Sequence, residues 1–361
     1  MTDLPPTLAQ YETRAEQALP PAIAAYFLRG AGAGHTMQRN RDDLNAVQIV
    51  PSVLRDLRGG HTRVQLLGRT LAHPILVAPM AYQTLLHPQG EAGTAAAATA
   101  QEAGMVLSAQ AAQPMAEVRA AGDACRWFQL YWMGSRAATL TLASRAAQAG
   151  FEALVLTVDA PVSGIRDAEI ETRFQLPDGL SAVNLHDLPS PSFAPLTETE
   201  SALFDRVAHV LPRWEDIAWL CENAPLPVLL KGILTPQDAR NAIQAGAAGV
   251  IVSNHGGRVL DGAPSAISAL PSVVRAAGGH PVLMDGGLRR GADVFRALAL
   301  GASAVLVGRP VAHGLAVAGA QGVSHVLRLL RDELEITMAL TGCARLDQIT
   351  AQTVRAPFMS S

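Results

Sequence analysis

The stretch Pro281-Val282-Leu283-Met284-Asp285-Gly286-Gly287 carries the pattern that decides the fold. A short run that is apolar on both faces is typical of a buried parallel strand, and this one ends in a carboxylate and two glycines. Runs of this kind recur at 75–78, 105–108, 127–130, 153–158, 227–231, 249–253, 281–285 and 304–308. Segments with a helical pattern separate them, among them 90–104, 137–150, 236–246 and 292–301, and several end in glycine.

These eight strand–helix units predict an α/β fold, namely a (β/α)8 TIM barrel. A doubly wound parallel sheet is the structural alternative. We expect a single domain over residues 1–361. Residues 1–73 form an N-terminal extension, with a helix over 9–29 and a strand pair beneath the barrel over 64–71. Residues 176–212 follow the fourth strand and are rich in Pro, Ser and Thr, so we expect a long mobile loop that serves as an active-site lid.

The composition narrows the class of protein. Hydrophobic residues make up 49% of the 361 residues and charged residues 16%, which is typical of a globular chain with a large core. Lys and Arg number 28 against 31 for Asp and Glu, so no basic excess is available for nucleic acid. Cys125, Cys221 and Cys343 lie far apart, and we expect neither a metal site nor a disulfide framework. No secretory signal and no membrane-spanning run is visible, which predicts a cytoplasmic protein.

Polar residues stand at or just after the ends of the predicted strands. Because the carboxyl ends of barrel strands meet at one mouth, we expect these side chains to surround an active site. Any one of them could instead be a satisfied core or surface residue. They are Ser108, Gln129, Tyr131, Thr157, Asp159, Lys231, Ser253, His255, Asp285 and Arg309.

Two of these strand ends suggest a phosphate site. Residues 285–291 and 308–310 combine glycines, whose backbone can approach an anion closely, with arginines that can hold it. The loops after strands seven and eight are the usual phosphate site of this barrel. A pair of ordinary tight turns is the alternative. No dinucleotide or P-loop motif is present, which favours a mononucleotide or a phosphorylated substrate.

Three further residues suggest acid–base and redox chemistry. His255, three residues before Arg258, suits a general base beside an anion-binding guanidinium. Asp159 could orient this histidine and stabilise its imidazolium form. Lys231 ends a strongly apolar run, and a buried lysine needs an anionic partner, which a cofactor that becomes anionic on reduction would supply.

Taken together, the runs 128–131, 157–159, 230–232, 253–258, 285–287 and 308–310 resemble the family of FMN-dependent 2-hydroxy acid oxidases and dehydrogenases. Glycolate oxidase, lactate oxidase, hydroxymandelate oxidase and mandelate dehydrogenase belong to this family. The resemblance implies FMN as cofactor and oxidation of an (S)-2-hydroxy acid to the 2-oxo acid. It also implies oxygen or another electron acceptor, and a homotetramer.

The resemblance further implies roles for individual residues. The catalytic group would consist of His255, Asp159, Lys231 and Tyr131, and the substrate would be bound by Tyr26, Tyr131, Arg166, His255 and Arg258. The positions that match flavin contacts are Pro79, Met80, Ala81, Ser108, Gln129, Thr157, Lys231, Ser253, Asp285, Gly286, Gly287, Leu288, Arg289, Gly308 and Arg309.

Some residues depart from the glycolate oxidase pattern. Gln110 stands where glycolate oxidases have Trp, and Met80 and Tyr82 replace Thr and Met. The predicted side-chain pocket, formed by Ala81, Gln110 and Tyr131, therefore has room for an aromatic, mandelate-like or medium-sized substrate. An L-lactate or glycolate oxidase is the alternative. An FMN barrel isomerase and a flavin-binding protein without catalysis are more remote alternatives.

Overall fold

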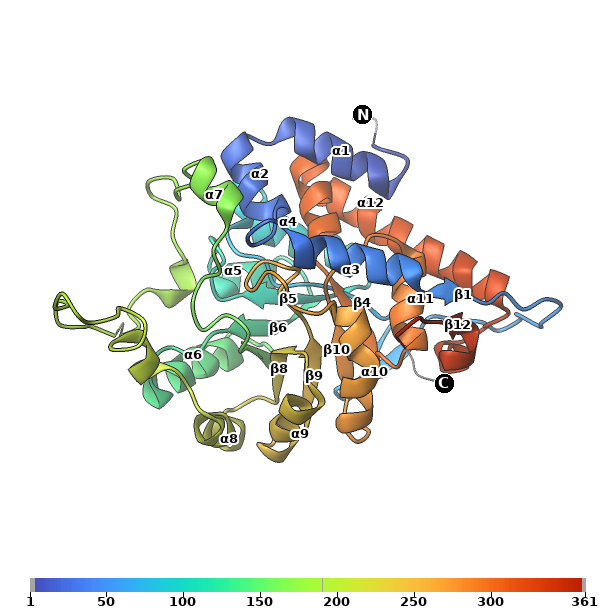
Figure 1. Ribbon diagram of the computed structural model, residues 1–361. Helices are drawn as coiled ribbons and strands as arrows, with labels where there is room; N and C mark the ends of the chain where they lie inside the picture. Colours follow the sequence, from blue (N-terminus) through green and yellow to red (C-terminus); the bar gives the residue numbers. More distant parts are fainter. Residues whose placement is uncertain (1–3, 190, 359–361) are drawn as a thin grey trace.

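The computed structural model describes residues 4–189 and 191–358, and its centre is a closed barrel of parallel strands (Figure 1). The strands follow one another around the barrel in the order β10-β11-β4-β5-β6-β7-β8-β9. Their bounds are β4 (Ile75–Val77), β5 (Gly104–Ser108), β6 (Cys125–Leu130), β7 (Ala153–Thr157), β8 (Val228–Ile233), β9 (Gly249–Val252), β10 (Val282–Met284) and β11 (Ala304–Val307). The predicted TIM barrel is confirmed, and the doubly wound sheet is wrong because β11 pairs with β4 and closes the ring.

The strands read as continuous apolar runs because both of their faces are buried. Alternate residues divide between two separate clusters. Leu76, Val106, Val155, Leu229, Ile251, Leu283 and Leu306 fill the barrel interior. Ile75, Val77, Leu154, Leu156, Leu230 and Val250 belong to the larger cluster between the strands and the helices. This division follows the two-residue period of a strand.

Helices surround the barrel (Figure 1). They are α4 (Gly90–Ala100), α5 (Met115–Ala120), α6 (Arg136–Gln148), α8 (Trp214–Asn223), α9 (Pro236–Gln244), α10 (Ala266–Ala276), α11 (Gly291–Ala299) and α12 (Arg309–Thr341). Ser135, Thr235 and Ser265 cap the N-termini of α6, α9 and α10, because each side-chain oxygen accepts a backbone N–H of the first turn. α12 is interrupted at Ala318 and Gly319, whose backbone angles are not helical.

The N-terminal extension contains α1 (Leu8–Ala18), α2 (Pro21–Leu28) and α3 (His35–Ala46). The single helix predicted over 9–29 is wrong. Pro20 and Pro21 divide it, because a proline lacks an N–H and disfavours helical backbone in the residue before it. α1 lies along α12 (Figure 1), and β1 (Gln48–Ile49) pairs with β12 (Val354–Arg355) near the C-terminus.

The predicted strand pair beneath the barrel is confirmed. β2 (Val64–Leu66) and β3 (Arg69–Leu71) form an antiparallel hairpin. Leu66 is buried in the same cluster as the residues of the barrel interior, with Leu67 and Leu71 packed against it. The hairpin therefore closes the end of the barrel opposite the carboxyl ends of the strands.

Residues 176–212 contain only two short 3-10 helices, η2 (Val183–Leu185) and η3 (Val207–Val210), within the described part of the segment. The segment extends away from the barrel at the left of Figure 1. Leu176 alone among its described residues lines the large cavity at the barrel mouth, and its role as a lid stays a prediction. The short helix α7 (Asp167–Glu171) precedes it. The other 3-10 helices are η1 (Gln83–Leu85), η4 (Leu346–Gln348) and η5 (Ala351–Thr353).

Candidate active site

A cavity of about 610 Å³ lies at the carboxyl ends of the barrel strands and gathers nearly all the predicted site residues. Those that line it are Tyr26, Pro79, Met80, Ala81, Ser108, Gln129, Tyr131, Thr157, Arg166, Lys231, His255, Arg258, Asp285, Gly286, Gly287, Leu288, Arg289, Gly308 and Arg309. Asp159 and Ser253 do not line it. They lie behind it, where Asp159 contacts His255 and Ser253 contacts Lys231.

The polar floor of the cavity follows from strand periodicity. Ser108, Gln129 and Thr157 each come two residues after an apolar residue of the barrel interior, so they continue the same inward face. Ser108 Oγ donates to Gln129 Oε1 at 3.2 Å, and Gln129 Nε2 donates to Thr157 Oγ1 at 3.0 Å. This chain of hydrogen bonds crosses β5, β6 and β7 and fixes the three side chains beneath the cavity.

Lys231 and Asp285 continue this inward face from β8 and from the end of β10. Lys231 Nζ lies 3.0 Å from Asp285 Oδ2 and donates to Ser253 Oγ at 2.8 Å. Burial alone would lower the pKa of Lys231, but the negative charges of Asp285 and Asp159 outweigh burial and raise it. Lys231 is thus a protonated cation in a fixed position. The next residue, Gly232, must lack a side chain, because a Cβ there would lie 2.4 Å from that of Asp159.

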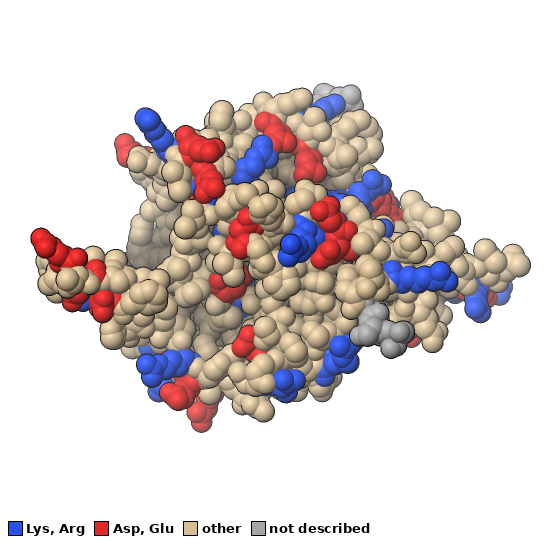
Figure 2. Space-filling view, viewed as in Figure 1, with Lys and Arg blue, Asp and Glu red and all other residues tan. Residues whose placement is uncertain are grey.

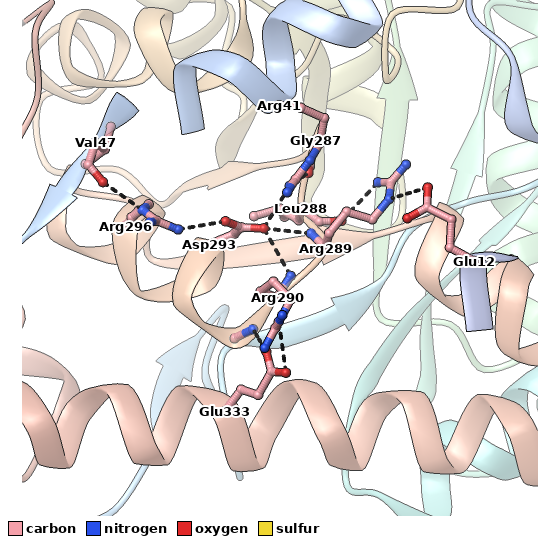
Figure 3. Close-up of polar contacts among 11 residues, drawn as sticks. Glu12, Arg41, Val47, Gly287, Leu288, Arg289, Arg290, Asp293, Arg296 and Glu333 are labelled. Carbon is pink, nitrogen blue, oxygen red and sulfur yellow. Dashed lines mark hydrogen bonds and ion pairs between the residues drawn. The ribbon is translucent and has the colours of Figure 1, made fainter. Parts of the chain in front are cut away.

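Behind the other end of the cavity lies Asp293, which is almost completely buried. Figure 3 shows its polar contacts. Its Oδ2 accepts the backbone N–H groups of Arg289 at 2.9 Å and Arg290 at 3.0 Å and contacts Arg41 Nη1 at 2.9 Å. Its Oδ1 contacts Arg296 Nη1 at 2.9 Å. One carboxylate therefore holds the loop after β10 and presents Arg289 to the cavity.

Arg309, at the start of α12, is the clearest candidate for an anion-binding residue in the cavity. Its Nη1 donates to the carbonyl of Gly256 at 2.9 Å and its Nη2 to that of Arg29 at 3.0 Å. Its buried Nε has no hydrogen-bond partner among the described residues. Burial, together with the positive charges of Arg289 and Arg258, holds the pKa of Arg309 well below its usual range.

These observations fit FMN. A buried guanidinium with a free N–H beside Arg289 and two glycine-rich loops suits a phosphate group. At the other end, the Lys231 ammonium, the unpartnered Asp285 Oδ1 and the Gln129 amide offer donors and acceptors to the polar edge of a ring system. The residues of the cavity therefore match the cofactor at both of its ends.

His255 has the geometry of a general base. Its Nδ1 lies 3.0 Å from Asp159 Oδ1, so Nε2 is the ring nitrogen left to take a proton from a substrate. Burial and the charge of Lys231 lower the pKa of His255, although Asp159 opposes them. The imidazole is therefore neutral near pH 7, which is the form that a base requires.

The backbone of the His255 loop is strained. His255 has φ +57°, a left-handed conformation that is uncommon for residues other than glycine, and Gly256 and Gly257 continue it with φ +63° and +75°. A Cβ at Gly257 would lie 2.6 Å from the backbone nitrogen of Met37 in α3. The N-terminal extension thus packs tightly against this loop and helps to hold His255 in its strained conformation.

Arg166 and Arg258 lie together on the other side of the mouth, beside Tyr26. Their guanidinium carbons are 5.9 and 5.3 Å from the centre of the Tyr26 ring, which stacks on Phe174 at 4.6 Å. Burial raises the pKa of Tyr26 to about 12, so this phenol stays a hydrogen-bond donor. Burial also raises the pKa of Tyr131. The arrangement suits a carboxylate held by two guanidiniums and a phenol.

Glu169 and Phe174 contact the predicted substrate-binding residues but were not predicted from the sequence. Glu169 Oε1 lies 2.9 Å from Arg166 Nη1 and 3.5 Å from Arg258 Nη2, and burial raises the pKa of this carboxyl despite both arginines. Phe174 stacks on Tyr26. The three-residue spacing between Arg166 and Glu169, typical of an ion pair on a helix, is the signal that could have identified Glu169.

The described residues contain no group of His, Cys, Asp and Glu side chains that could hold a metal ion, and Cys221 and Cys343 are free thiols. The side chain of Cys125 lies outside what the structure describes.

Comparison with known proteins gives consistent matches along the chain. Residues 15–356 match the family model for FMN-dependent dehydrogenases. An L-lactate oxidase from Roseobacter sp. (strain GAI101) is 50% identical over 348 residues, which cover 96% of this chain and 94% of the relative. Glycolate oxidase 1 from Zea mays is 45% identical over 349 residues, with coverages of 96% and 94%. The crystal structure of a mandelate oxidase with (S)-2-phenylpropionate is 40% identical, covers 97% of each chain and has a TM-score of 0.86.

Proposed function

The chain belongs to the FMN-dependent dehydrogenase family and oxidises 2-hydroxy acids, and on that basis we propose that its substrate is a small aliphatic (S)-2-hydroxy acid such as L-lactate. We further propose that oxygen accepts the electrons, because its relatives with the highest identities given above are named as oxidases.

One observation carries the part of this proposal that concerns 2-hydroxy acid oxidation. His255, which is backed by Asp159, lines the same cavity as Arg166 and Arg258. A base and a carboxylate clamp are together what the oxidation of a 2-hydroxy acid needs from the protein. The reaction removes two electrons and two protons from the carbinol group next to the carboxylate, one hydrogen from its carbon and one from its hydroxyl oxygen. An isomerase that acts on a diphosphate would have no use for the two arginines at this end.

Each residue then has a defined task. FMN, held by Arg309 at one end and Lys231 at the other, would supply the acceptor for the electron pair of the substrate. Arg166 and Arg258 hold the substrate carboxylate, which fixes the carbinol carbon within the cavity. His255 takes a substrate proton at Nε2, and Asp159 stabilises the imidazolium that results. Lys231 would supply a fixed positive charge to the edge of the cofactor that becomes negative on reduction.

The choice of a small substrate departs from the aromatic substrate predicted from Ala81, Gln110 and Tyr131. Those three residues do line the cavity, but so do Tyr82, which the sequence analysis noted only as a replacement for Met, and Phe174, which it did not include. The Tyr26 ring stacks on Phe174 and lies 6.4 Å from the ring of Tyr82, so aromatic side chains already occupy this side of the mouth. The L-lactate oxidase, at 50% identity, is also nearer in sequence than the mandelate oxidase, at 40%.

A substrate panel tests the proposal. Glycolate, L-lactate, D-lactate, mandelate and 4-hydroxymandelate are compared by oxygen uptake, and flavin bleaching is followed without oxygen. We expect the highest kcat/KM with L-lactate and no bleaching with D-lactate. A higher kcat/KM with mandelate would restore the aromatic prediction. Fast bleaching combined with slow oxygen uptake would show that another acceptor replaces oxygen.

The remaining predictions concern the oligomeric state of the enzyme and its location in the cell. None of the helices described in residues 4–189 and 191–358 has the length and apolar character needed to cross a membrane. On the face seen in Figure 2, basic and acidic side chains are interspersed. The homotetramer and the cytoplasmic location stay predictions. Light scattering of the purified protein and fractionation of cells test them.

A further inference from the structure

Glu169 has a position in the site that neither acid–base chemistry nor cofactor binding explains. It lies on α7, three residues after Arg166, and its side chain is only 14% exposed. One of its oxygens, Oε1, contacts both Arg166 and Arg258, at 2.9 and 3.5 Å. Glu169 lines the cavity together with both arginines.

The charges at this end of the cavity come from three side chains. Arg166 and Arg258 contribute two positive charges, and Glu169 contributes one negative charge. The other acidic groups of the site are engaged elsewhere, Asp159 with His255 and Asp285 with Lys231. Among Arg166, Arg258 and Glu169 the balance is one positive charge, which a single substrate carboxylate neutralises.

We propose that Glu169 is a positioning and specificity residue that restricts this site to substrates with one carboxylate. Its carboxylate holds the two guanidiniums side by side and cancels one of their charges. This inference rests on the proposed function, because it takes Arg166 and Arg258 as the site of the substrate carboxylate.

The physical reason is like-charge repulsion in a partly desolvated cavity. A 2-hydroxy diacid that places its first carboxylate on Arg166 and Arg258 uses up the one positive charge that Glu169 leaves at this end of the cavity, so the negative charge of Glu169 repels its second carboxylate. A neutral side chain of the same shape meets no such repulsion. Discrimination would therefore depend on charge rather than on size.

Ligand binding to the FMN-loaded enzyme tests this without turnover. The flavin absorbance is titrated at pH 8 with freshly dissolved oxaloacetate and with 4-methyl-2-oxopentanoate, which has nearly the same shape but lacks the second carboxylate. For the wild type we expect oxaloacetate to bind at least about tenfold more weakly, as one like charge at close range requires. Equal dissociation constants would overturn the proposal.

Three variants separate charge from structure. Glu169→Gln should reduce the ratio of the two dissociation constants by about tenfold, whereas Glu169→Asp should keep it. Glu171→Gln, on an exposed position of the same helix, is the matched control and should leave the ratio unchanged. The inference is wrong if Glu169→Asp changes the ratio as much as Glu169→Gln does. The choice between L-lactate and mandelate is measured separately, so failure of one proposal does not imply failure of the other.

Discussion

Lys231 Nζ lies 3.0 Å from Asp285 Oδ2, and the two side chains are only 4% and 10% exposed. Lys231 lies in β8 and Asp285 directly after β10. Because β9 lies between these two strands in the barrel, the ion pair links strands that are not direct neighbours. A buried pair is costly to break from one side, because the remaining charge is left without a partner.

Replacement of Lys231 by Met should therefore have two effects. Loss of one partner of the buried pair should lower the free energy of unfolding by about 3–5 kcal/mol. Loss of the fixed cation should lower the flavin reduction potential and slow substrate oxidation. Thermal unfolding and a redox titration measure the two effects. The double variant with Asp285→Asn should regain part of the stability but not the potential, and an unchanged potential in Lys231→Met would place the lysine away from the flavin.

Replacement of His255 by Ala should leave FMN bound and the barrel folded. Reduction of the flavin by L-lactate should slow by about 10²–10⁴-fold or more, because no other described residue with a free ring nitrogen faces this part of the cavity. Stopped-flow absorbance under anaerobic conditions measures the rate, and the visible spectrum controls for cofactor loss. Near-normal reduction would identify another group as the base.

The pH dependence follows from the lowered pKa of His255, which burial and Lys231 cause against the effect of Asp159. The neutral imidazole is the active form, so kcat/KM should stay level as the pH falls to about 6.5 and decline only below it. Asp159→Asn removes the charge that favours the imidazolium, so the acidic limb should move to still lower pH while the plateau falls. A limb above pH 7 in the wild type would contradict this assignment.

FMN affinity should depend on Arg309 and, through the loop, on Asp293. Arg309→Ala should weaken binding by about 1.5–3 kcal/mol, the range for a hydrogen bond to a charged group. Asp293→Asn should also weaken it, because the Arg289 and Arg290 backbone loses its common acceptor. Quenching of FMN fluorescence measures both. The exposed ion-pair variant Arg328→Ala on α12 is the control and should bind FMN normally.

The site residues at the ends of the strands were predictable from the sequence, because the topology of the barrel alone brings these ends together. Ser108, Thr157 and Asp285 share the inward face of a closed parallel barrel, and this follows from period and connectivity. Glu169 and Phe174 were not predictable in the same way. They lie on the connection after β7, and their place at the mouth depends on how that connection folds against Tyr26.

Closure of the ring by β11 against β4 has a consequence for synthesis of the protein. β4 is the first barrel strand to leave the ribosome, and its partner β11 is the last. Until β11 has been made, one edge of β4 has no strand to pair with and is open to association with other chains. A chain released before residue 304 would keep this edge permanently, so premature termination should yield aggregates rather than a smaller soluble enzyme.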